Sequence, residues 1–366
     1  MNFATPTGTR DFNKHFSEIA EGHFRDAQGL NLSSIGIGTY LGNWDSATDE
    51  KYENSVIKYV ESGGNVIDTA SNYRFQRSER NIGKALKKLA GKFDRSELFI
   101  ATKGGFLPFD NEPAGDVRKY FEETFVKTGA ANMEDLVADS HCMTPDYLQI
   151  QIDQSLQNMD IEGLDLFYIH NPETQLRAGV QRPVFEAMIA GAFERLEENR
   201  KNGKINFYGV ASWRGFRARP DEQDYHSLER FVQIAEQVGG REHGFKFIQL
   251  PYNLGMLEAY VLPNQSANGK AVPAIHAAND LGMSVMISQT ILQGKLTAGV
   301  PIHIRETLDG LTTDAQTSVQ FVRSTPGVIS ALVGMSSAGH VEENMSLAKV
   351  PPTDREKFAE LFAKDA

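Results

Sequence analysis

The sequence predicts an α/β fold, a single (β/α)8 barrel domain that spans residues 1–366. Short apolar segments of strand length alternate with longer amphipathic segments along the chain. Eight such strand–helix pairs follow one another, which is the order of a (β/α)8 barrel. No linker or change of composition marks a second domain, and 366 residues fit one barrel with insertions.

The predicted strands are short apolar runs, and the predicted helices carry apolar residues at three- and four-residue steps. Typical is EKYENSVIKYV at 50–60, which has the helical period and ends before Gly63 and Gly64. The strands are predicted at 34–38, 65–68, 98–102, 165–170, 206–211, 245–250, 283–288 and 327–333. The helices are predicted at 50–60, 78–89, 146–159, 183–202, 227–238, 271–281, 315–324 and 338–348, with a last helix at 355–363.

Two segments depart from this repeat. The first 30 residues precede it, and we expect 8–12 and 22–28 to form an N-terminal hairpin at the bottom of the barrel. The segment 106–143 holds Pro, Gly and many acidic residues without one clear period, so it is predicted to be a long insertion after the third strand. Because long segments of this kind are usually functional loops, we expect it to cover the site and to shape substrate choice.

Charge and composition exclude several classes of protein. The net charge is −11, with 48 acidic against 37 basic residues, which argues against a nucleic-acid partner. No apolar run approaches the roughly 18 residues of a membrane helix, and the N-terminus lacks an apolar signal-peptide core. Cys142 is the only cysteine, so no internal disulfide can form. We therefore expect a cytoplasmic protein without a membrane partner; the sequence leaves its oligomeric state open.

Several motifs of known chemistry are incomplete. GIGTYLG at 36–42 has Leu41 where the dinucleotide fingerprint requires its third glycine, which favours a simple turn. GMSSAG at 334–339 lacks the spacing of a nucleophile elbow. The nine histidines show no paired metal-ligand spacing, so no metal site is predicted.

Polar residues at the ends of three neighbouring strands form the strongest functional signal. Asp68 ends the second predicted strand, Tyr73 follows it by five residues, and Lys103 and His170 come at the ends of the third and fourth strands. In a barrel, catalytic residues lie at these carboxyl ends, so the four side chains can converge. Each residue alone also has an ordinary explanation, as a cap, a rim aromatic, a solvated lysine or a packing histidine.

Together the four residues suit the reduction of a carbonyl group. A proton donor is needed beside the carbon that accepts hydride, and a tyrosine gives up its proton reluctantly because its pKa is near ~10. A nearby lysine ammonium favours the phenolate, and a buried lysine needs a counter-ion such as Asp68. A neutral histidine can orient the substrate oxygen.

NVIDTASNY at 65–73, IATKGG at 100–105 and DLFYIHNPE at 165–173 resemble the three catalytic blocks of the aldo-keto reductases. The resemblance extends from about residue 32 to 347 and implies a (β/α)8 TIM barrel. It implies an NAD(P)-dependent oxidoreductase that interconverts an aldehyde or ketone and the corresponding alcohol. By this resemblance Tyr73 is the general acid or base, and His170 orients the carbonyl. Lys103 adjusts the pKa of Tyr73, with Asp68 as the counter-ion of Lys103.

The resemblance also implies a set of cofactor-binding residues. They are Gly38, Thr39, Tyr40, Asp68, Ser212, Gln249, Ser288, Gln289, Gln293, Gly294, Leu296, Gly334, Ser336, Ser337, His340, Glu343 and Asn344. Four positions depart from the family. Ser212 replaces an asparagine that holds the nicotinamide carboxamide, and Ser288 or Gln289 stands where an aromatic ring usually stacks on the nicotinamide. Gly334 and His340 occupy positions where relatives carry basic residues.

The implied cofactor is NADP, with NAD as the alternative. The 2′-phosphate of NADP would find His340, the Ser336 and Ser337 hydroxyls and the free N–H groups at the start of the last barrel helix. The same segment is also consistent with an ordinary helix start in which Ser336 or Ser337 is the N-cap.

Two other functions are considered. One is a cofactor-binding barrel that acts mainly as a regulatory or partner-binding subunit; the complete set of four catalytic residues favours an enzyme instead. The other is a hydrolase on the same fold, which lacks a metal cluster and a nucleophile–base pair. The substrate is expected to be a small carbonyl compound or alcohol. Candidates for the pocket wall, each of which could equally be core or rim, are Trp44, Phe75, Phe106, Phe109 and Trp213.

Overall fold

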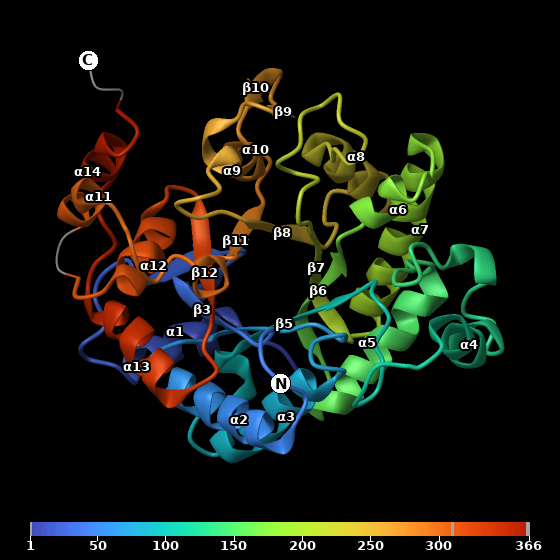
Figure 1. The fold of residues 1–366 in the computed structure, drawn as a ribbon, viewed down its shortest axis with the longest axis horizontal. Coiled ribbons are helices and arrows are strands. Elements are labelled where there is room, and N and C mark those ends of the chain that lie inside the picture. The colour runs from blue at the N-terminus through green and yellow to red at the C-terminus, as the bar shows by residue number, and fades with distance from the viewer. Residues whose placement is uncertain (1, 309–310, 364–366) are drawn as a thin grey trace.

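Eight parallel strands form a closed barrel at the centre of the computed structural model, which describes residues 2–308 and 311–363 (Figure 1). The strands follow one another around the barrel in chain order, and the last pairs with the first, with Gly334 opposite Gly38. Their bounds are β3 Ile35–Gly38, β4 Val66–Asp68, β5 Phe99–Gly104, β6 Leu164–His170, β7 Ile205–Ala211, β8 Phe245–Pro251, β11 Ser284–Ser288 and β12 Val328–Gly334. The predicted barrel is confirmed, and each predicted strand lies within two residues of the observed one.

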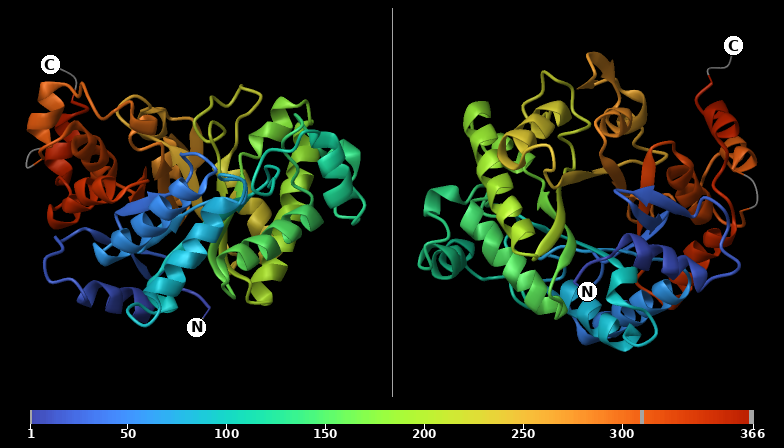
Figure 2. Two further views of the ribbon diagram at one scale, coloured as in Figure 1. Left: turned by 60° about the horizontal axis from the view of Figure 1, so that its bottom comes forward. Right: turned by 180° about the vertical axis from the view of Figure 1, so that it is seen from behind.

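A helix follows each strand and packs on the outside of the barrel, as the tilted view in Figure 2 shows. The eight helices are α2 Ser46–Glu61, α3 Arg77–Leu89, α5 Pro145–Met159, α7 Arg182–Lys201, α8 Leu228–Gly239, α10 Ala274–Asp280, α12 Asp314–Ser324 and α13 Ala338–Met345. Local signals set their starts: the side chain of Asp45 accepts a hydrogen bond from the N–H of Thr48, and Pro145 occupies the first turn of α5.

Shorter elements lie between and after these helices. They are α6 Glu173–Arg177, α9 Glu258–Val261, the hairpin β9 Gln265–Ala267 and β10 Lys270–Val272, α11 Ile302–Thr307, α14 Arg355–Glu360, and the 3-10 turns η1 Arg95–Glu97, η4 Leu292–Gly294 and η5 Ser346–Lys349. The helix predicted at 271–281 begins later because β10 occupies its first residues and Pro273 precedes α10. Within the described ranges, no helix is both long enough and apolar enough to cross a membrane.

The hydrophobic core has two parts, one inside the barrel and one between the strands and the helices. Inside the barrel, the rings of Phe99 and Phe247 pack with centroids 5.4 Å apart. Around them lie Val66, Ala101, Leu166, Tyr168, Ala211, Met286 and Leu332. Because side chains fill the interior, the chemistry of the barrel is restricted to its ends.

The N-terminal segment contains a helix as well as a hairpin. The hairpin pairs β1 Phe24–Ala27 with β2 Leu30–Ser33, and it lies toward the viewer in the right panel of Figure 2. Leu30 and Leu32 of β2 join the cluster inside the barrel. The prediction of a strand at 8–12 is wrong, because these residues belong to helix α1, Pro6–Lys14. The side chain of Thr5 caps this helix by accepting from the N–H of Gly8 at 2.9 Å.

The insertion 106–143 is partly helical and lies mostly beside the barrel. It forms α4 Val117–Phe121, a π-helical turn η2 Glu122–Val126 and a 3-10 turn η3 Met133–Asp135. In Figure 1, α4 lies on the outer side of α5, where the buried ring of Phe125 packs 4.6 Å from that of Tyr147. The largest part of the insertion does not reach the cavity at the carboxyl ends of the strands: Phe106 alone of its described residues lines that cavity. The expectation that the insertion covers the site is therefore wrong for most of its length.

Candidate active site

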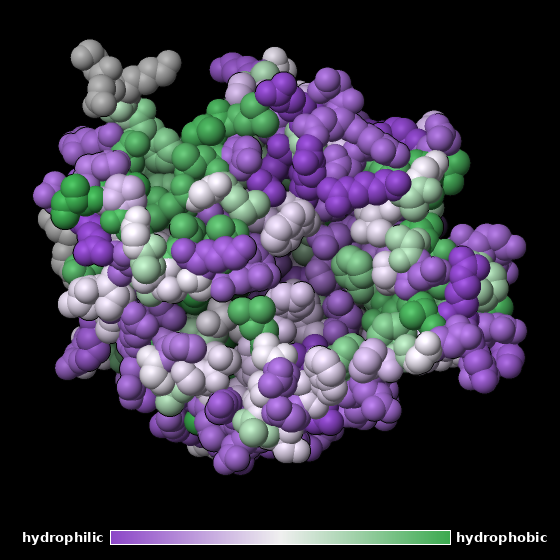
Figure 3. All heavy atoms as spheres, viewed as in Figure 1, coloured by the Kyte–Doolittle hydropathy of each residue, from purple (hydrophilic) through white to green (hydrophobic). Residues whose placement is uncertain are grey.

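A cavity of about 500 Å³ opens at the carboxyl ends of the barrel strands. Figure 3 shows the face on which the surface is hollowed near its centre. Nearly every strand contributes at or near its last residue: the lining includes Gly38, Asp68, His170, Ala211, Gln249, Ser288 and Gly334. The barrel therefore brings residues from distant parts of the sequence to a single site.

Lys103 and Asp68 form a buried ion pair beside this cavity. The Nζ atom of Lys103 donates to Oδ1 of Asp68 at 2.6 Å and to the carbonyl oxygen of Thr69 at 2.7 Å. Burial alone would lower the pKa of Lys103, but the Asp68 carboxylate and the Tyr73 phenol outweigh burial, so this pKa is raised. Lys103 is consequently a cation at neutral pH.

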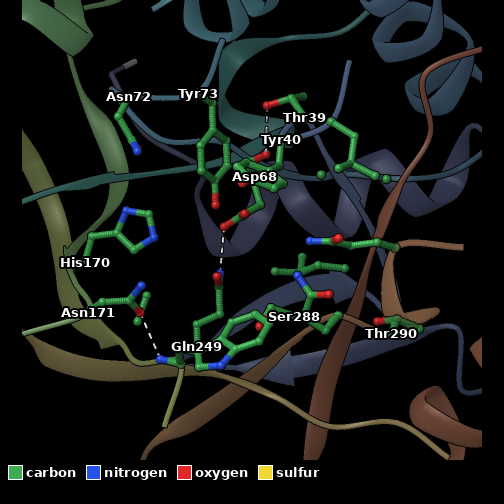
Figure 4. Close-up of a pocket in the computed structure, with 18 of the residues that line it drawn as sticks. Thr39, Tyr40, Asp68, Asn72, Tyr73, His170, Asn171, Gln249, Ser288 and Thr290 are labelled. Atoms are coloured by element: carbon green, nitrogen blue, oxygen red, sulfur yellow. Dashed lines mark hydrogen bonds between the residues drawn. The ribbon is translucent and has the colours of Figure 1, made fainter. Parts of the chain in front are cut away.

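Tyr73 is a neighbour of both Lys103 and His170, and its hydroxyl points into the cavity (Figure 4). The centroid of the Tyr73 ring is 4.9 Å from the Nζ atom of Lys103 and 6.0 Å from the centroid of the His170 ring. Burial raises the pKa of Tyr73, and the Lys103 ammonium only partly opposes this increase. The sequence predicts that Lys103 lowers the pKa of Tyr73, but burial outweighs this effect. The phenol is therefore protonated at neutral pH.

His170 is a neutral side chain next to Tyr73 in the cavity. Burial, and next the Lys103 ammonium, lower the pKa of His170 well below its ordinary value. Its Nδ1 atom is buried and has no hydrogen-bond partner among the described residues. The Phe106 ring and the imidazole pack nearly at right angles, with centroids 5.0 Å apart. An uncharged imidazole at this place can orient a substrate oxygen.

His141 connects the insertion to the strand end that carries His170. The Nε2 atom of His141 lies 2.8 Å from the carbonyl oxygen of His170. Because a carbonyl oxygen only accepts, Nε2 carries the proton, and Nδ1 accepts from the Gln175 amide at 3.0 Å. Burial lowers the pKa of His141 to about 4, so the ring is neutral. Sequence reasoning did not identify this contact.

Gln249 and Ser212 face the cavity from β8 and from the end of β7, and each is held by a carboxylate. The amide of Gln249 donates to Oδ2 of Asp68 at 2.7 Å. The hydroxyl of Ser212 donates to Oε1 of Glu173 at 3.0 Å and accepts from the N–H of Gly215 at 2.7 Å. Both residues were predicted as cofactor ligands, and both line the cavity.

The far wall of the cavity comes from the loop after β11. Gln289 and Gln293 adopt left-handed backbone conformations with φ of 59° and 54°. The side-chain amide of Asn253 donates to the Gln289 carbonyl oxygen at 2.8 Å and fixes the start of this loop. Of the predicted cofactor residues, those that line the cavity are Gly38, Thr39, Tyr40, Asp68, Ser212, Gln249, Ser288, Gln289, Gln293, Gly294 and Gly334.

The remaining predicted cofactor residues lie outside the cavity, in the η4–α12 connection and at α13. They are Leu296, Ser336, Ser337, His340, Glu343 and Asn344. Ser337 is the N-cap of α13 and accepts from the N–H of His340, while the Glu343 carboxylate accepts from the Thr313 hydroxyl at 2.7 Å. The Oδ1 atom of Asn344 is buried without a hydrogen-bond partner in the described part of the chain.

The aromatic residues considered for the pocket wall divide into two groups. Phe106 and Trp213 line the cavity, and Trp213 is 41% exposed. Trp44 instead packs against Phe75, with ring centroids 5.1 Å apart, and Phe109 packs against Tyr120 at 4.9 Å. Trp44, Phe75 and Phe109 do not line the cavity, so for them the alternative of core or rim holds.

Several lining residues escaped sequence reasoning. They are Leu41, Asn72, Asn171, Ala211, Thr290, Ile291 and Leu332. The same strand-end rule that identified His170 could have found Asn171, which directly follows it in a left-handed conformation with φ 46°. No group of three or more His, Cys, Asp or Glu residues that could hold a metal occurs in the described ranges.

A family model supplies the decisive comparison. The model described as "Aldo/keto reductase family" matches residues 34–218, just over half of the chain, including the strands that carry Asp68, Lys103 and His170. This chain belongs to the aldo/keto reductase family. Its (β/α)8 barrel agrees with the fold that this family implies.

Curated relatives are distant. An NADH-specific methylglyoxal reductase of Escherichia coli is 27% identical over half of this chain and 49% of its own length. A probable aldo-keto reductase of Glycine max is 27% identical over 63% of this chain and 55% of its own. The chain therefore spans about half the length of the curated relatives that it matches.

Solved structures match the fold over nearly the full length. An aldo-keto reductase from Bacillus halodurans in its holo form superimposes with a TM-score of 0.63 at 20% identity, covering 94% of this chain and 97% of that one. An aldo/keto reductase from Klebsiella pneumoniae in complex with NADP and acetate gives 0.59 at 18% identity, covering 93% and 94%. At these identities the comparisons establish the barrel alone.

Proposed function

We propose that this protein is an NADP-dependent oxidoreductase that interconverts a small aldehyde or ketone and the corresponding alcohol. The observation that carries the proposal is that Tyr73, Asp68 and His170 line one cavity, while Lys103 is paired with Asp68 and lies against the Tyr73 ring. A protonated phenol, a neutral imidazole and a buried ammonium together suit proton transfer to a carbonyl oxygen.

Each side chain has one role in the proposed reaction. The chemistry that a bound nicotinamide supplies is hydride transfer to the carbonyl carbon. Tyr73 donates the proton that the carbonyl oxygen gains, so an alcohol and a tyrosinate result, and the Lys103 ammonium stabilises the tyrosinate. His170 orients the carbonyl oxygen, and Asp68 balances the charge of Lys103 in the buried site.

The residues at the cavity and beyond it fit a dinucleotide. Ser212 and Gln249 offer oxygen atoms to the cavity beside Asp68, and the loop of Gln293 and Gly294 lies on the opposite wall. At α13, the buried Oδ1 atom of Asn344 lacks a partner in the described chain, which suits an exocyclic amine such as that of adenine. His340 is exposed at the start of α13, where helix N–H groups favour a phosphate.

The proposal is tested with purified protein, NADPH or NADH, and a panel of small aldehydes and ketones. We expect oxidation of the reduced cofactor that depends on the carbonyl compound and on Tyr73. The Tyr73→Phe variant is the matched control, because it keeps the ring and removes the hydroxyl. Cofactor binding without turnover by any compound of the panel would instead support the partner-binding subunit, a function suggested by a 25% identical relative named as a putative voltage-gated potassium channel subunit beta.

A further inference from the structure

The hydroxyl of Ser212 has one free hydrogen-bonding position, which is an acceptor. Its single proton is donated to Glu173, and one of its two acceptor positions is taken by the N–H of Gly215. Ser212 is 4% exposed and lines the cavity. Toward a ligand in the cavity, this hydroxyl can therefore accept a hydrogen bond but cannot donate one.

Glu173 is the residue that imposes this restriction. It is 1% exposed, and its Oε1 atom accepts both from the Ser212 hydroxyl and from the N–H of Arg214 at 2.9 Å. Burial would raise the pKa of Glu173, but contacts with His226 and with the backbone outweigh burial and lower this pKa to about 2. Glu173 is thus an ionised carboxylate at neutral pH, and an ionised carboxylate can only accept.

Gln249 is restricted in the same direction. Its amide nitrogen donates to Oδ2 of Asp68 at 2.7 Å, and the ionised Asp68 that pairs with Lys103 requires a donor there. The amide oxygen of Gln249 is consequently the atom that remains for a ligand. Two acceptors, on Ser212 and on Gln249, therefore face the cavity, whereas an asparagine at 212 would also offer a donor.

We propose that Glu173 is a positioning residue that makes Ser212 a hydrogen-bond acceptor for the amide nitrogen of a bound nicotinamide. The inference rests on the proposed function, since it presumes that a nicotinamide occupies this end of the cavity. A carboxamide NH₂ group has two N–H donors, which match the acceptors on Ser212 and Gln249. Glu173 itself touches neither cofactor nor substrate and acts through Ser212.

The test measures how strongly the protein distinguishes two ligands by fluorescence titration. One is the oxidised dinucleotide, and the other is its acetylpyridine analogue, in which a methyl group replaces the amide NH₂. We expect wild-type protein to bind the analogue roughly tenfold more weakly, because two acceptors lose their donors. In Glu173→Met the Ser212 proton is released and can turn to the ligand oxygen. The ratio of the two dissociation constants, analogue over dinucleotide, should therefore fall to roughly twofold or threefold.

Conservative variants separate positioning from simple stability. Glu173→Gln keeps an oxygen for Ser212 and Arg214, and it should retain the wild-type ratio. Glu173→Asp is one methylene shorter and should lose the ratio as Glu173→Met does, which provides a second variant if the methionine variant does not fold. Ser212→Ala should give the same reduced ratio, and adding Glu173→Met to it should change nothing further.

The outcomes distinguish this inference from the proposed function. Binding of both ligands by Glu173→Met and Glu173→Asp with an unchanged ratio would overturn the role of Glu173 and leave the function intact. Failure of the wild-type protein to bind NADP or NAD at all would overturn both. A reduced ratio in these two variants and a retained ratio in Glu173→Gln would establish the positioning role.

Discussion

The Nζ atom of Lys103 lies 2.6 Å from Oδ1 of Asp68, and both side chains are almost completely buried. A lone ammonium at this depth would lose its proton, and a lone carboxylate would gain one. The pair keeps both charges in place next to the Tyr73 ring, so the chemistry of the phenol depends on an interaction one step away from it.

Tyr73→Phe should lower turnover by about 10²–10⁴-fold, because the variant lacks the proton donor. The cofactor affinity should stay nearly unchanged, since the ring and its contacts with Tyr40 and His170 remain. Steady-state kinetics and fluorescence titration measure the two quantities. Wild-type turnover in this variant would show that another group supplies the proton.

Lys103→Met should slow the proposed reaction in both directions, and alcohol oxidation should be slowed more than carbonyl reduction. Without the ammonium, the already raised pKa of Tyr73 rises further, and the phenolate needed as a base for oxidation becomes scarcer. Asp68→Asn should be milder. Lys87→Met, which changes an exposed lysine paired with Asp160, is the control. A rate–pH profile for oxidation that does not move in Lys103→Met would contradict this mechanism.

His141 should make the protein less stable in mild acid. Its folded-state pKa of about 4 lies below the ordinary 6.5, so the unfolded chain binds the proton first. Stability is therefore lost as pH falls from 6.5 toward 4, and at pH 5 the loss is about 2 kcal/mol. His141→Gln keeps a donor for the His170 carbonyl oxygen and does not titrate. Denaturant unfolding at pH 7 and pH 5 should show a smaller loss in the variant than in wild type.

Phe125→Ala should destabilise the protein by about 3 kcal/mol, because it removes a buried ring that packs against Tyr147. Replacing the whole insertion by a short Gly/Ser connection should expose Tyr147 and cost stability as well. Val184→Ala, at a 56% exposed position, is the matched control and should change little. Equal unfolding free energies for Phe125→Ala and wild type would show that the insertion does not contribute to the core.

His340→Ala should weaken the binding of NADP more than that of NAD. His340 is exposed at the first turn of α13, and no lysine or arginine lies within the segment 334–344 to take over a 2′-phosphate. Parallel fluorescence titrations with both cofactors provide the measurement. Tighter binding of NAD than of NADP by the wild-type protein would refute the proposed cofactor preference.

The barrel and the four central residues could be predicted because their signals are local. A strand such as DLFYIH is followed at once by the polar residues of its loop, and the barrel places every such end on one face. Helix α1 also had a local signal, the cap Thr5 before Pro6, which was overlooked. The packing of Phe125 on Tyr147 depends on residues 22 positions apart in an irregular segment, and no period reveals it.

The role of Glu173 could not be predicted for a similar reason. Its position after HNP suggests only a helix start, and its partners Ser212 and Arg214 lie 39 and 41 residues further along the chain. Whether a carboxylate folds back toward a neighbouring loop depends on the spacing of β6 and β7 in the closed barrel. Contacts of this kind become visible only in three dimensions.

In the loop after β7, side chains accept the hydrogen bonds of three consecutive backbone N–H groups. The N–H groups of Trp213, Arg214 and Gly215 donate in succession to the side chains of Asn171, Glu173 and Ser212. We expect these three amide protons to exchange with solvent as slowly as those of the adjoining strand, although they lie in a loop. Because this wall of the cavity is ordered before a ligand arrives, binding there loses little conformational entropy.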